Sequence, residues 1–407
     1  MNIDLPGPFG FFLNCDSPEF LRLAHDPGGL LEPGNYRTSR PGIVLLAAAL
    51  SRPLFWVGSL ASRIPVKTDL ELRESDRASA LARCLPAYAA YVLINACTLV
   101  LAFILYFSIL HRARPQTSDS IVRPECAFSL PVLAAGSLLL LNDVTKAFFW
   151  SPHTQLFNIM APVFCCWTVL AAWRDRLFEK RRVFPLTLLA GFVVTVYPSF
   201  LLFYPCLILP AAVRSARAPL PGETAARFVK RAILLLLVFA LPYGAWYLFV
   251  TCATGAFSIP EISRYGQGVR VLESLRSGVA AFVGTLLSNA VSIIRGMLPQ
   301  SLAALALMAF FLVLRRRPPA EAGCPPPAIG PIAAASLFTS LLFLVFFSFV
   351  GYHPPRIAYS LVPPLIVLDG ALASAESPAL SRLAPAVSVS AALAYGLFII
   401  LKDGPYY

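Results

Sequence analysis

Long apolar runs, repeated along almost the whole chain, restrict its fold more than any other feature of the sequence. As helices, runs near 20 residues match the thickness of the hydrocarbon core of a bilayer. Of the 407 residues, 57% are hydrophobic and only 13% are charged, whereas a soluble domain carries about a quarter charged residues. The runs are continuously apolar rather than alternating, which argues against a transmembrane β-barrel. We therefore predict an all-α polytopic membrane protein with about 9–11 transmembrane helices and interfacial juxtamembrane helices on its outer face. The candidate spans lie near residues 86–110, 127–141, 154–173, 184–213, 232–251, 298–314, 329–350, 358–374 and 384–401.

The net charge of +12 comes from short Lys/Arg clusters at the ends of the apolar runs. This pattern is typical of cytoplasmic membrane loops and unlike the extended basic face of a nucleic-acid-binding protein, so we predict no nucleic-acid partner. The strongest clusters, at 174–182, 214–231 and 315–317, are predicted to be cytoplasmic. The stretch 184–213 then begins and ends inside, and we expect it to fold back as two short helices near Tyr197-Pro198-Ser199. Many Arg relative to Lys, and abundant Ala, suggest a bacterial inner (plasma) membrane protein.

The N-terminal region is predicted to stay outside the membrane. The apolar run 43–61 has Arg52-Pro53 at its centre; a central arginine costs at least about 2.5–3.5 kcal/mol on insertion scales, and proline breaks a helix. We predict two short juxtamembrane helices here, with a true span as the alternative. Residues 1–85 would then form a first extracytoplasmic segment, and 86–407 the transmembrane domain, including an outer loop at 252–297. Within that loop, apolar residues at helical spacing in 270–295 predict an amphipathic interfacial helix.

This topology places three groups of polar residues on the outer side of the membrane. They are Asp16, Glu19, His25 and Asp26; then Asp143, Lys146 and His153; then His353 and Arg356. A carboxylate beside cations suits transfer from a lipid-phosphate donor, because the carboxylate takes a proton from the acceptor hydroxyl. Arg or Lys can then neutralise the phosphate leaving group.

Each of these residues also has a structural explanation. Asp16-Ser-Pro-Glu19 is a helix-start pattern, as plausible as catalysis for Asp16 and more plausible for Glu19. Asp143 follows a run of leucines at a membrane boundary, and Lys146 can extend to the interface. His153 follows Ser-Pro and can cap the next span. Arg356 can be a topology charge, although positive charges are less expected outside. Asp26-Pro27-Gly28 predicts a turn. No Cys/His spacing predicts a metal site, and most of the nine cysteines lie in apolar runs, as expected of free buried thiols.

Four segments together resemble the GT-C superfamily of integral-membrane glycosyltransferases, including mannosyltransferase- and aminoarabinose-transferase-like members. "DSPEFLRLAHDP" resembles the family's first outer loop, with Asp16 at the acidic position. "YRTSRPGIVLLAAALSRPLFW" resembles the basic, proline-containing start of the juxtamembrane helices. "NDVTKAFFWSPHTQLFN" stands where the family has a second outer loop with polar active-site residues. "GYHPPRIAYSLVPPLIVLDGAL" resembles a late segment near the donor phosphate. Members normally carry a transmembrane helix before the acidic loop, so we expect that helix either to lie upstream of the printed start or to have been lost.

The resemblance implies sugar transfer from a polyprenyl-phosphate-linked donor to a lipid or glycan acceptor at the extracytoplasmic face, as part of building the cell envelope. Asp16 would be the general base, and the remaining implied residues would bind substrate or phosphate. These are Asp143, Lys146, His153, His353, Arg356, Arg264 and Arg270. The resemblance requires no cofactor, although a divalent metal is compatible with it.

Other functions also fit the sequence. A lipid or glycan transporter or flippase would carry ionisable residues in mid-span and paired broken helices. A polysaccharide ligase or polymerase would use the same lipid carriers, with 252–297 as its late outer loop. A non-enzymatic assembly subunit is the remaining alternative, and fold analogy does not choose among these.

Overall fold

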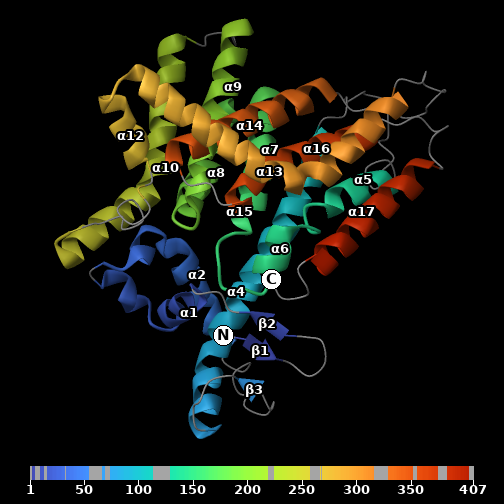
Figure 1. Cartoon of the computed structure of the whole chain (residues 1–407). Coiled ribbons are helices and arrows are strands. Elements are labelled where there is room, and N and C mark those ends of the chain that lie inside the picture. Colours follow the sequence, from blue (N-terminus) through green and yellow to red (C-terminus); the bar gives the residue numbers. More distant parts are fainter. Residues whose placement is uncertain are drawn as a thin grey trace.

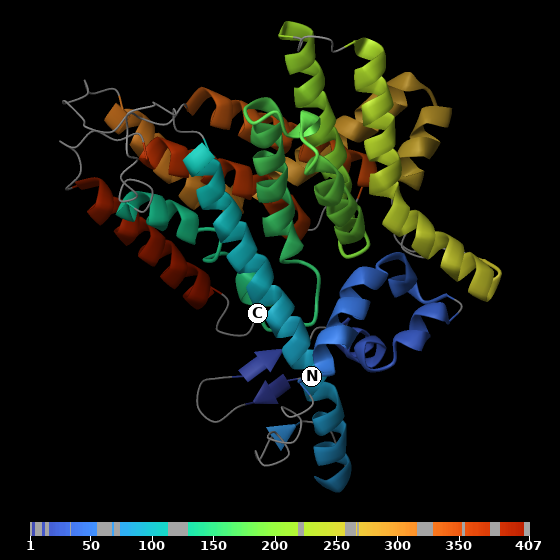
Figure 2. The ribbon, with the colours of Figure 1, turned by 180° about the vertical axis from the view of Figure 1, so that it is seen from behind.

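The chain folds into a helical bundle with a small three-stranded sheet beside it (Figures 1 and 2). The computed structural model describes residues 16–54 without 33, 74–112, 129–218, 224–256, 266, 268–315, 329–351, 355–374 and 383–402, together with the three strands. The sheet is antiparallel, with β1 (Asn2–Asp4) between β2 (Gly10–Phe12) and β3 (Lys67–Thr68). The α-helices are α1 (Ser17–His25), α2 (Pro41–Ser51), α4 (Glu74–Arg112), α5 (Leu130–Ser137), α6 (Asp143–Phe148), α7 (Phe157–Trp173), α8 (Val183–Val194), α9 (Phe203–Arg217), α10 (Ala225–Thr254), α12 (Val269–Arg276), α13 (Val279–Arg315), α14 (Ile329–Val350), α15 (Pro355–Ala358), α16 (Val362–Ala373) and α17 (Leu383–Lys402). Short 3₁₀ helices are η1 (Pro27–Leu31), η2 (Tyr36–Ser39), η4 (Leu177–Glu179), η5 (Pro198–Leu202) and η6 (Tyr359–Leu361).

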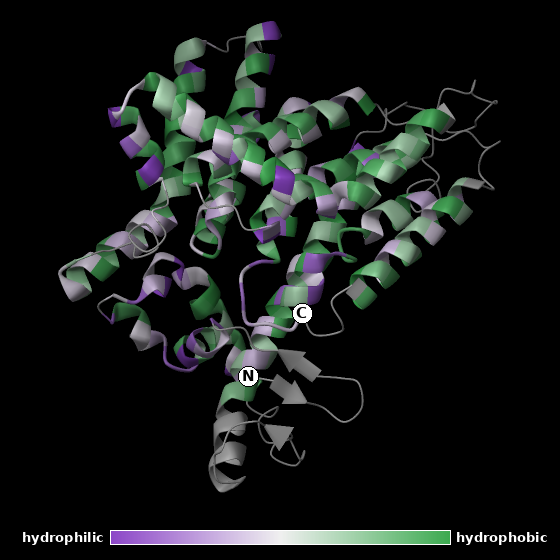
Figure 3. Ribbon diagram, viewed as in Figure 1, coloured by the Kyte–Doolittle hydropathy of each residue, from purple (hydrophilic) through white to green (hydrophobic). Residues whose placement is uncertain are grey.

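Seven helical segments of the described chain are long and apolar enough to cross a membrane. They cover 84–112, 198–217, 225–254, 279–313, 329–350, 355–373 and 384–401, and α2, α7 and α8 are shorter apolar helices. The apolar residues cover the helices of the bundle, as Figure 3 shows. The predicted class, an all-α polytopic membrane protein, is therefore confirmed.

The predicted span at 127–141 is wrong for the residues described. Helix α5 ends after eight residues at Ser137. The reason is Asn142, whose side-chain amide donates to the carbonyl oxygens of Leu138 and Leu139 at 3.3 and 2.9 Å. The amide oxygen of Asn142 also accepts from the backbone of Thr145 at 2.8 Å. One side chain thus closes α5 and caps α6, which the hydropathy of the run does not indicate.

The fold-back predicted within 184–213 is confirmed. Helix α8 ends at Val194, and the chain restarts at Pro198 as η5 and continues into α9. An ion pair between Arg214 of α9 and Glu179, which precedes α8, holds the two ends of this hairpin together. A second ion pair, Arg112–Asp175, ties the end of α4 to the same place. We call this region, marked by Arg112, Asp175, Glu179 and Arg214, the basic end.

The short helix predicted before Arg52-Pro53 is confirmed. Helix α2 ends at Ser51, directly before Arg52-Pro53, so the first half of 43–61 is a short helix as expected; residues 55–61 lie outside the described part. The single helix predicted at 270–295 is wrong. Helix α12 ends at Arg276, and Gly278 breaks the chain with a φ of +119°. Helix α13 then runs without a break from Val279 to Arg315, through the predicted span at 298–314.

The segment from α1 to α2 packs against the bundle near the turn between α8 and η5. Helices α1 and α2 contact α4, and α2 also contacts α8. The backbone amide of Gly42 donates to the carbonyl of Thr195 at 3.0 Å. A Cβ at Gly42 would lie 2.8 Å from Cγ2 of Val196, so only glycine permits this approach. The indole of Trp246 on α10 donates to the carbonyl of Thr38 at 2.8 Å and fixes η2.

Candidate functional site

Asp16 stands directly before α1, at the N-cap position, but its side chain makes no capping hydrogen bond. Its Oδ2 instead lies 3.1 Å from Nη2 of Arg37 and 3.3 Å from Nε2 of His153. The side chain of Asp16 is 36% exposed, whereas those of Arg37 and His153 are each only 5% exposed. The carboxylate is therefore the accessible member of a group whose two partners are buried.

Arg37 lies in η2, and two aromatic rings contact its guanidinium beside Asp16. Its guanidinium carbon lies 4.1 Å from the ring centre of Phe20 and 4.4 Å from that of Tyr36. Both distances suit a cation–π interaction, which fixes the plane and position of the guanidinium. The positive charge next to Asp16 is thus held in place by packing as well as by the ion pair.

His153 lies in the loop after α6, between the rings of Phe20 and Phe148. Its Nδ1 accepts a hydrogen bond from the backbone amide of Thr154 at 2.9 Å. In the neutral imidazole the proton is then on Nε2, which donates to Asp16. Burial lowers the pKa of His153 to about 4; the charges of Arg37 and Arg356 add to the effect, while the bond to Asp16 opposes it. His153 is therefore a neutral donor at pH 7.

These contacts keep Asp16 ionised. The hydrogen bond from His153 and the charge of Arg37 hold the pKa of the Asp16 carboxyl well below its usual range, although burial acts in the opposite direction. Such a carboxylate accepts hydrogen bonds throughout the physiological pH range.

Helix α4 positions both halves of the site. The hydroxyl of Tyr91 donates to the carbonyl of Phe20 in α1 at 3.2 Å. The amide of Asn95 donates to three carbonyls, of Phe148, Phe149 and Ser151, at 2.9 to 3.1 Å and so shapes the loop that carries His153. The hydroxyls of Ser17 and Ser151 lie 3.2 Å apart and join the loop to α1.

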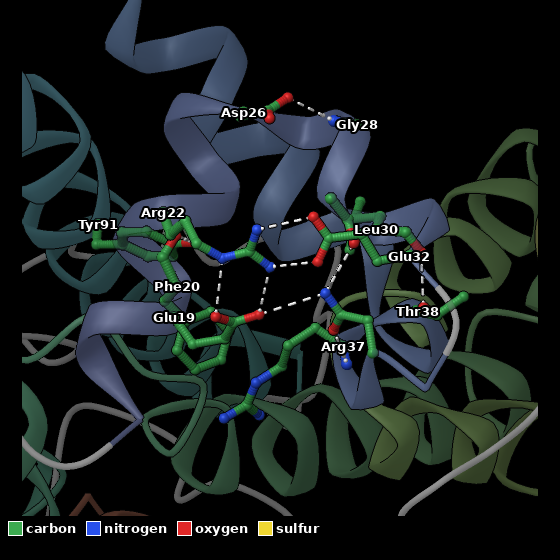
Figure 4. A network of polar contacts seen from close by, with 12 residues as sticks. Glu19, Phe20, Arg22, Asp26, Gly28, Leu30, Glu32, Arg37, Thr38 and Tyr91 are labelled. Atoms are coloured by element: carbon green, nitrogen blue, oxygen red, sulfur yellow. Dashed lines mark hydrogen bonds and ion pairs between the residues drawn. The ribbon is translucent and has the colours of Figure 1, made fainter.

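A separate ionic network holds the α1–η2 segment in shape (Figure 4). Arg22 lies between two carboxylates, with bonds of 3.0 to 3.1 Å to Glu19 and 3.0 Å to Glu32. Asn35 donates to Glu19 at 3.3 Å and to the carbonyl of Gly29 at 2.8 Å. The guanidinium of Arg37 points away from this network. The helix start predicted at Asp16–Glu19 is confirmed, but Asp16 does not cap the helix and the carboxylate of Glu19 binds Arg22 and Asn35. The turn predicted at Asp26 is confirmed, since its carboxylate accepts from Gly28 at 3.1 Å.

A second polar cluster joins three elements around Asn158 of α7, which is fully buried. Its amide oxygen accepts from the hydroxyls of Tyr197 and Ser360, at 2.5 and 3.0 Å. Its amide nitrogen donates to Gln155 at 2.7 Å and to the carbonyl of Arg356 at 3.1 Å. All the hydrogen-bonding capacity of Asn158 is therefore used, and it fixes the short helix α15 that carries Arg356.

Three arginines surround these two clusters. Arg37 and Arg356 both act on the pKa of His153. Burial raises the pKa of Tyr197, and the charges of Arg40 and Arg356 oppose that shift. Arg356 thus acts on a member of each cluster, whereas Arg37 acts on His153 and Arg40 on Tyr197. These guanidinium groups give the region positive charge, which attracts an anion.

The other predicted site residues have different positions. Nζ of Lys146 donates to the carbonyls of Ile399 and Ile400 at 2.6 and 3.3 Å, so Lys146 binds the end of α17. Asp143 begins α6 and acts electrostatically on Tyr359 and Tyr395 rather than on the Asp16 group. Arg270 is exposed on α12. His353 and Arg264 lie outside the described residues.

Several residues were not assigned from the sequence. Arg37 and Arg40 stand three residues apart before an apolar helix, a spacing that was a usable signal. Asn158 is a single amide at the start of an apolar run, and Asp369 is a single acid within one. Asp369 is fully buried, and neither carboxylate oxygen has a hydrogen-bond partner in the part of the chain that the structure describes. Within that part, no three His, Cys, Asp or Glu side chains gather as a metal site would require. Cys165, Cys166 and Cys206 are buried free thiols, as predicted, whereas Cys97, in another apolar run, is a free thiol that is exposed.

Comparison with known proteins adds no assignment: no family model, no curated protein and no solved structure matches this chain.

Proposed function

We propose that this protein is an integral-membrane glycosyltransferase that moves a sugar from a polyprenyl-phosphate-linked donor to a lipid or glycan acceptor. The observation that carries the proposal is the Asp16 group: a partly exposed carboxylate held by a buried arginine and a buried neutral histidine. The charge of Arg356 acts on His153 of this group, and the charge of Arg40 acts on Tyr197 of the Asn158 cluster. A carboxylate beside an anion-attracting region provides the two functions that such a transfer needs.

In the proposed reaction, Asp16 accepts the proton of the acceptor hydroxyl. The acceptor oxygen forms a bond to the anomeric carbon of the sugar, and the bond from that carbon to the phosphate oxygen breaks, leaving its electron pair on the phosphate. Attack from the face opposite the phosphate inverts the anomeric centre. Arg356 and Arg40 neutralise the departing phosphate, as charge-assisted hydrogen bonds do. His153 and Arg37 orient the carboxylate.

The low pKa of Asp16 in the resting site has a consequence for this mechanism. A strongly stabilised carboxylate is a weak base. The acceptor hydroxyl must therefore weaken the bond from His153 or the ion pair with Arg37 as it approaches, which raises the basicity of Asp16 when the acceptor is in place.

We infer that the Asp16 group faces the extracytoplasmic side of a bacterial inner membrane. The basic clusters at 174–182 and 214–231 belong on the cytoplasmic side by the positive-inside rule. The segment carrying Asp16 and Arg37 packs against the turn between α8 and η5, at the other end of the hairpin from those clusters.

The direct experiment measures transfer of radiolabelled sugar from polyprenyl-phosphate donors by purified protein. Asp16→Asn should lower turnover by at least about a hundredfold, the usual size of a general-base contribution. Asp26→Asn is the matched control, because it removes the same charge from an exposed turn of the same segment and leaves an amide that can still accept from Gly28. Full turnover in Asp16→Asn would overturn the assignment of the base.

One observation favours the second candidate, a lipid or glycan transporter. Asp369 is an acidic residue buried within a candidate span, and intramembrane acids often lie on ion or proton pathways. Reconstituted vesicles separate the two functions. A transporter moves labelled lipid across the bilayer without sugar transfer and loses this activity in Asp369→Asn, whereas a transferase keeps sugar transfer in that variant. Polymerisation of lipid-linked units in the transfer assay would instead indicate the ligase or polymerase.

A further inference from the structure

Exposed basic side chains gather at the basic end, where α4, α7 and α9 finish and α8 and α10 begin. Seven of them lie in or beside the two connections that meet there: Arg176, Lys180, Arg181, Arg182, Arg217, Arg227 and Lys230. The proposed sugar transfer uses none of these residues.

Contacts between the connections make this region one surface. Arg112 pairs with Asp175, and Arg174 donates to the carbonyl of Arg112. Nη2 of Arg231 on α10 donates to the carbonyl of Lys180 at 3.1 Å. Together with the Arg214–Glu179 ion pair, these contacts join the ends of α4, α9 and α10 to the connection between α7 and α8.

The acidic residues of this surface are already occupied. Among the described residues of these connections, Asp175 and Glu179 are the carboxylates, and each forms an ion pair with a partly buried arginine. Among the described residues of these connections the exposed charged side chains are therefore positive, which favours an anionic partner.

The backbone at Arg176 gives an independent sign that the connection is held in a defined shape. Arg176 has φ +52° and ψ +44°, and it is the residue other than glycine with a positive φ in the described chain. Side-chain-bearing residues adopt this conformation rarely, and it persists where surrounding contacts fix it. Here the contacts are the ion pairs of Asp175 and Glu179 on either side.

Aromatic rings contact two of the arginines of this surface and bear on its depth relative to the membrane. The guanidinium of Arg217 lies 5.8 Å from the ring centre of Trp173, the last residue of α7. That of Arg231 lies 5.6 Å from Phe178 and 5.4 Å from Phe184. Tryptophan at the end of an apolar helix is typical of the membrane interface. The tryptophan beside Arg217 thus supports a position of these basic residues near lipid headgroups.

We propose that this surface binds the headgroups of anionic phospholipids in the leaflet that it faces. Its positive charge and its depth both match those headgroups, and juxtamembrane Lys/Arg clusters attract anionic lipids. A soluble acidic partner fits the charge but not the position, since the exposed residues lie next to helix ends within the interface. The proposal does not depend on the sugar-transfer activity.

The test reconstitutes the full chain in membranes of equal phosphatidylglycerol and phosphatidylcholine, extracts it in mild detergent and counts retained lipids by native mass spectrometry. The wild type should retain phosphatidylglycerol over phosphatidylcholine by at least about threefold. Arg181→Gln/Arg182→Gln should lower this ratio by about threefold or more. The matched control is Arg52→Gln/Arg276→Gln, which removes two exposed arginines, one directly after α2 and one in α12, and should leave the ratio unchanged.

Three results would overturn the proposal. They are an unselective wild type, an unchanged ratio in the Arg181/Arg182 variant, and binding of soluble polyglutamate with no retained phosphatidylglycerol. Arg181→Lys/Arg182→Lys, which keeps the charge, should restore the enrichment, so loss through misfolding is separated from loss of charge.

Discussion

Arg37 and Asp16 form the interaction on which the candidate site depends, and its strength can be worked out from the structure. An exposed ion pair contributes about 0–1 kcal/mol, and breaking a fully buried one costs about 3–5 kcal/mol. Here the side chain of Arg37 is 5% exposed and that of Asp16 36%, so about 1–3 kcal/mol is expected for the pair. The contacts with Phe20 and Tyr36 add about 0.5–1 kcal/mol each. Arg37→Met should therefore lower the free energy of unfolding by about 2–5 kcal/mol.

A double-mutant cycle isolates the pair from the packing. Arg37→Met, Asp16→Asn and the double variant are compared by unfolding in mixed micelles of increasing sodium dodecyl sulfate. We expect a coupling energy of about 1–2 kcal/mol. The control cycle is Arg22→Met with Glu32→Gln, an ion pair in the same segment whose side chains are 43% and 55% exposed, which should couple by less than about 0.5 kcal/mol. A coupling for Arg37 and Asp16 as small as that of the control would refute the claim that this site is a buried, preorganised ion pair.

Three further predictions concern His153, Lys146 and Gly42. The pKa of His153 is about 4 in the folded protein against an ordinary 6.5, so between these values the unfolded chain binds more protons. The stability that depends on neutral His153 is complete above about pH 6.5 and falls as the pH is lowered towards 4, by up to about 1.4 kcal/mol per pH unit. His153→Gln should flatten this dependence of the unfolding free energy on pH. An unchanged slope would contradict the assignment of His153 as a buried neutral histidine. Lys146→Met should lower stability by about 0.5–1.5 kcal/mol through loss of its hydrogen bonds to α17. The binding of polyprenyl phosphate, measured by calorimetry, should not weaken in this variant. Weaker binding would show that Lys146 contributes to a phosphate site. Gly42→Ala should cost about 1–3 kcal/mol in the same micelle titration, because its Cβ would meet Val196 at 2.8 Å, and a cost below about 0.5 kcal/mol would show that α2 can shift away from α8.

The membrane-spanning helices could be predicted because a helix that crosses a bilayer must be continuously apolar, and long apolar runs are visible in the sequence. The fold-back at Tyr197-Pro198 was predictable for a related reason, since basic clusters lie at both ends of one apolar stretch. The errors arose where single side chains decide where helices begin and end. Asn142 holds the turn after one helix and caps the next through hydrogen bonds, and Gly278 interrupts a stretch whose apolar spacing predicts a single helix. Hydropathy averages over such residues.

The candidate site was predictable only as a set of residues on one side of the membrane. Topology brought Asp16, His153 and Arg356 to the same face, but a charge pattern carries no distances. It could not separate His153, whose Nε2 meets Asp16, from Lys146, which binds a carbonyl 253 residues away in the sequence. The spacing of Arg37 and Arg40 before an apolar helix was a signal for basic residues at this place, but the sequence did not show that Arg37 is buried between two aromatic rings beside Asp16.

The two predicted roles of Asp16, helix cap and functional acid, compete for the same oxygens. A side-chain cap usually contributes about 1 kcal/mol to a helix, and Asp16 stands where one is expected yet makes none. Part of that loss is offset by Pro18 in the first turn, which lacks the N–H that would otherwise need an acceptor. The carboxylate is thereby left to Arg37 and His153, two buried residues from separate segments. A helix start that gives up its cap in order to hold a partly exposed carboxylate against a buried arginine and a buried neutral histidine is better explained by an interaction with a ligand than by the stability of α1.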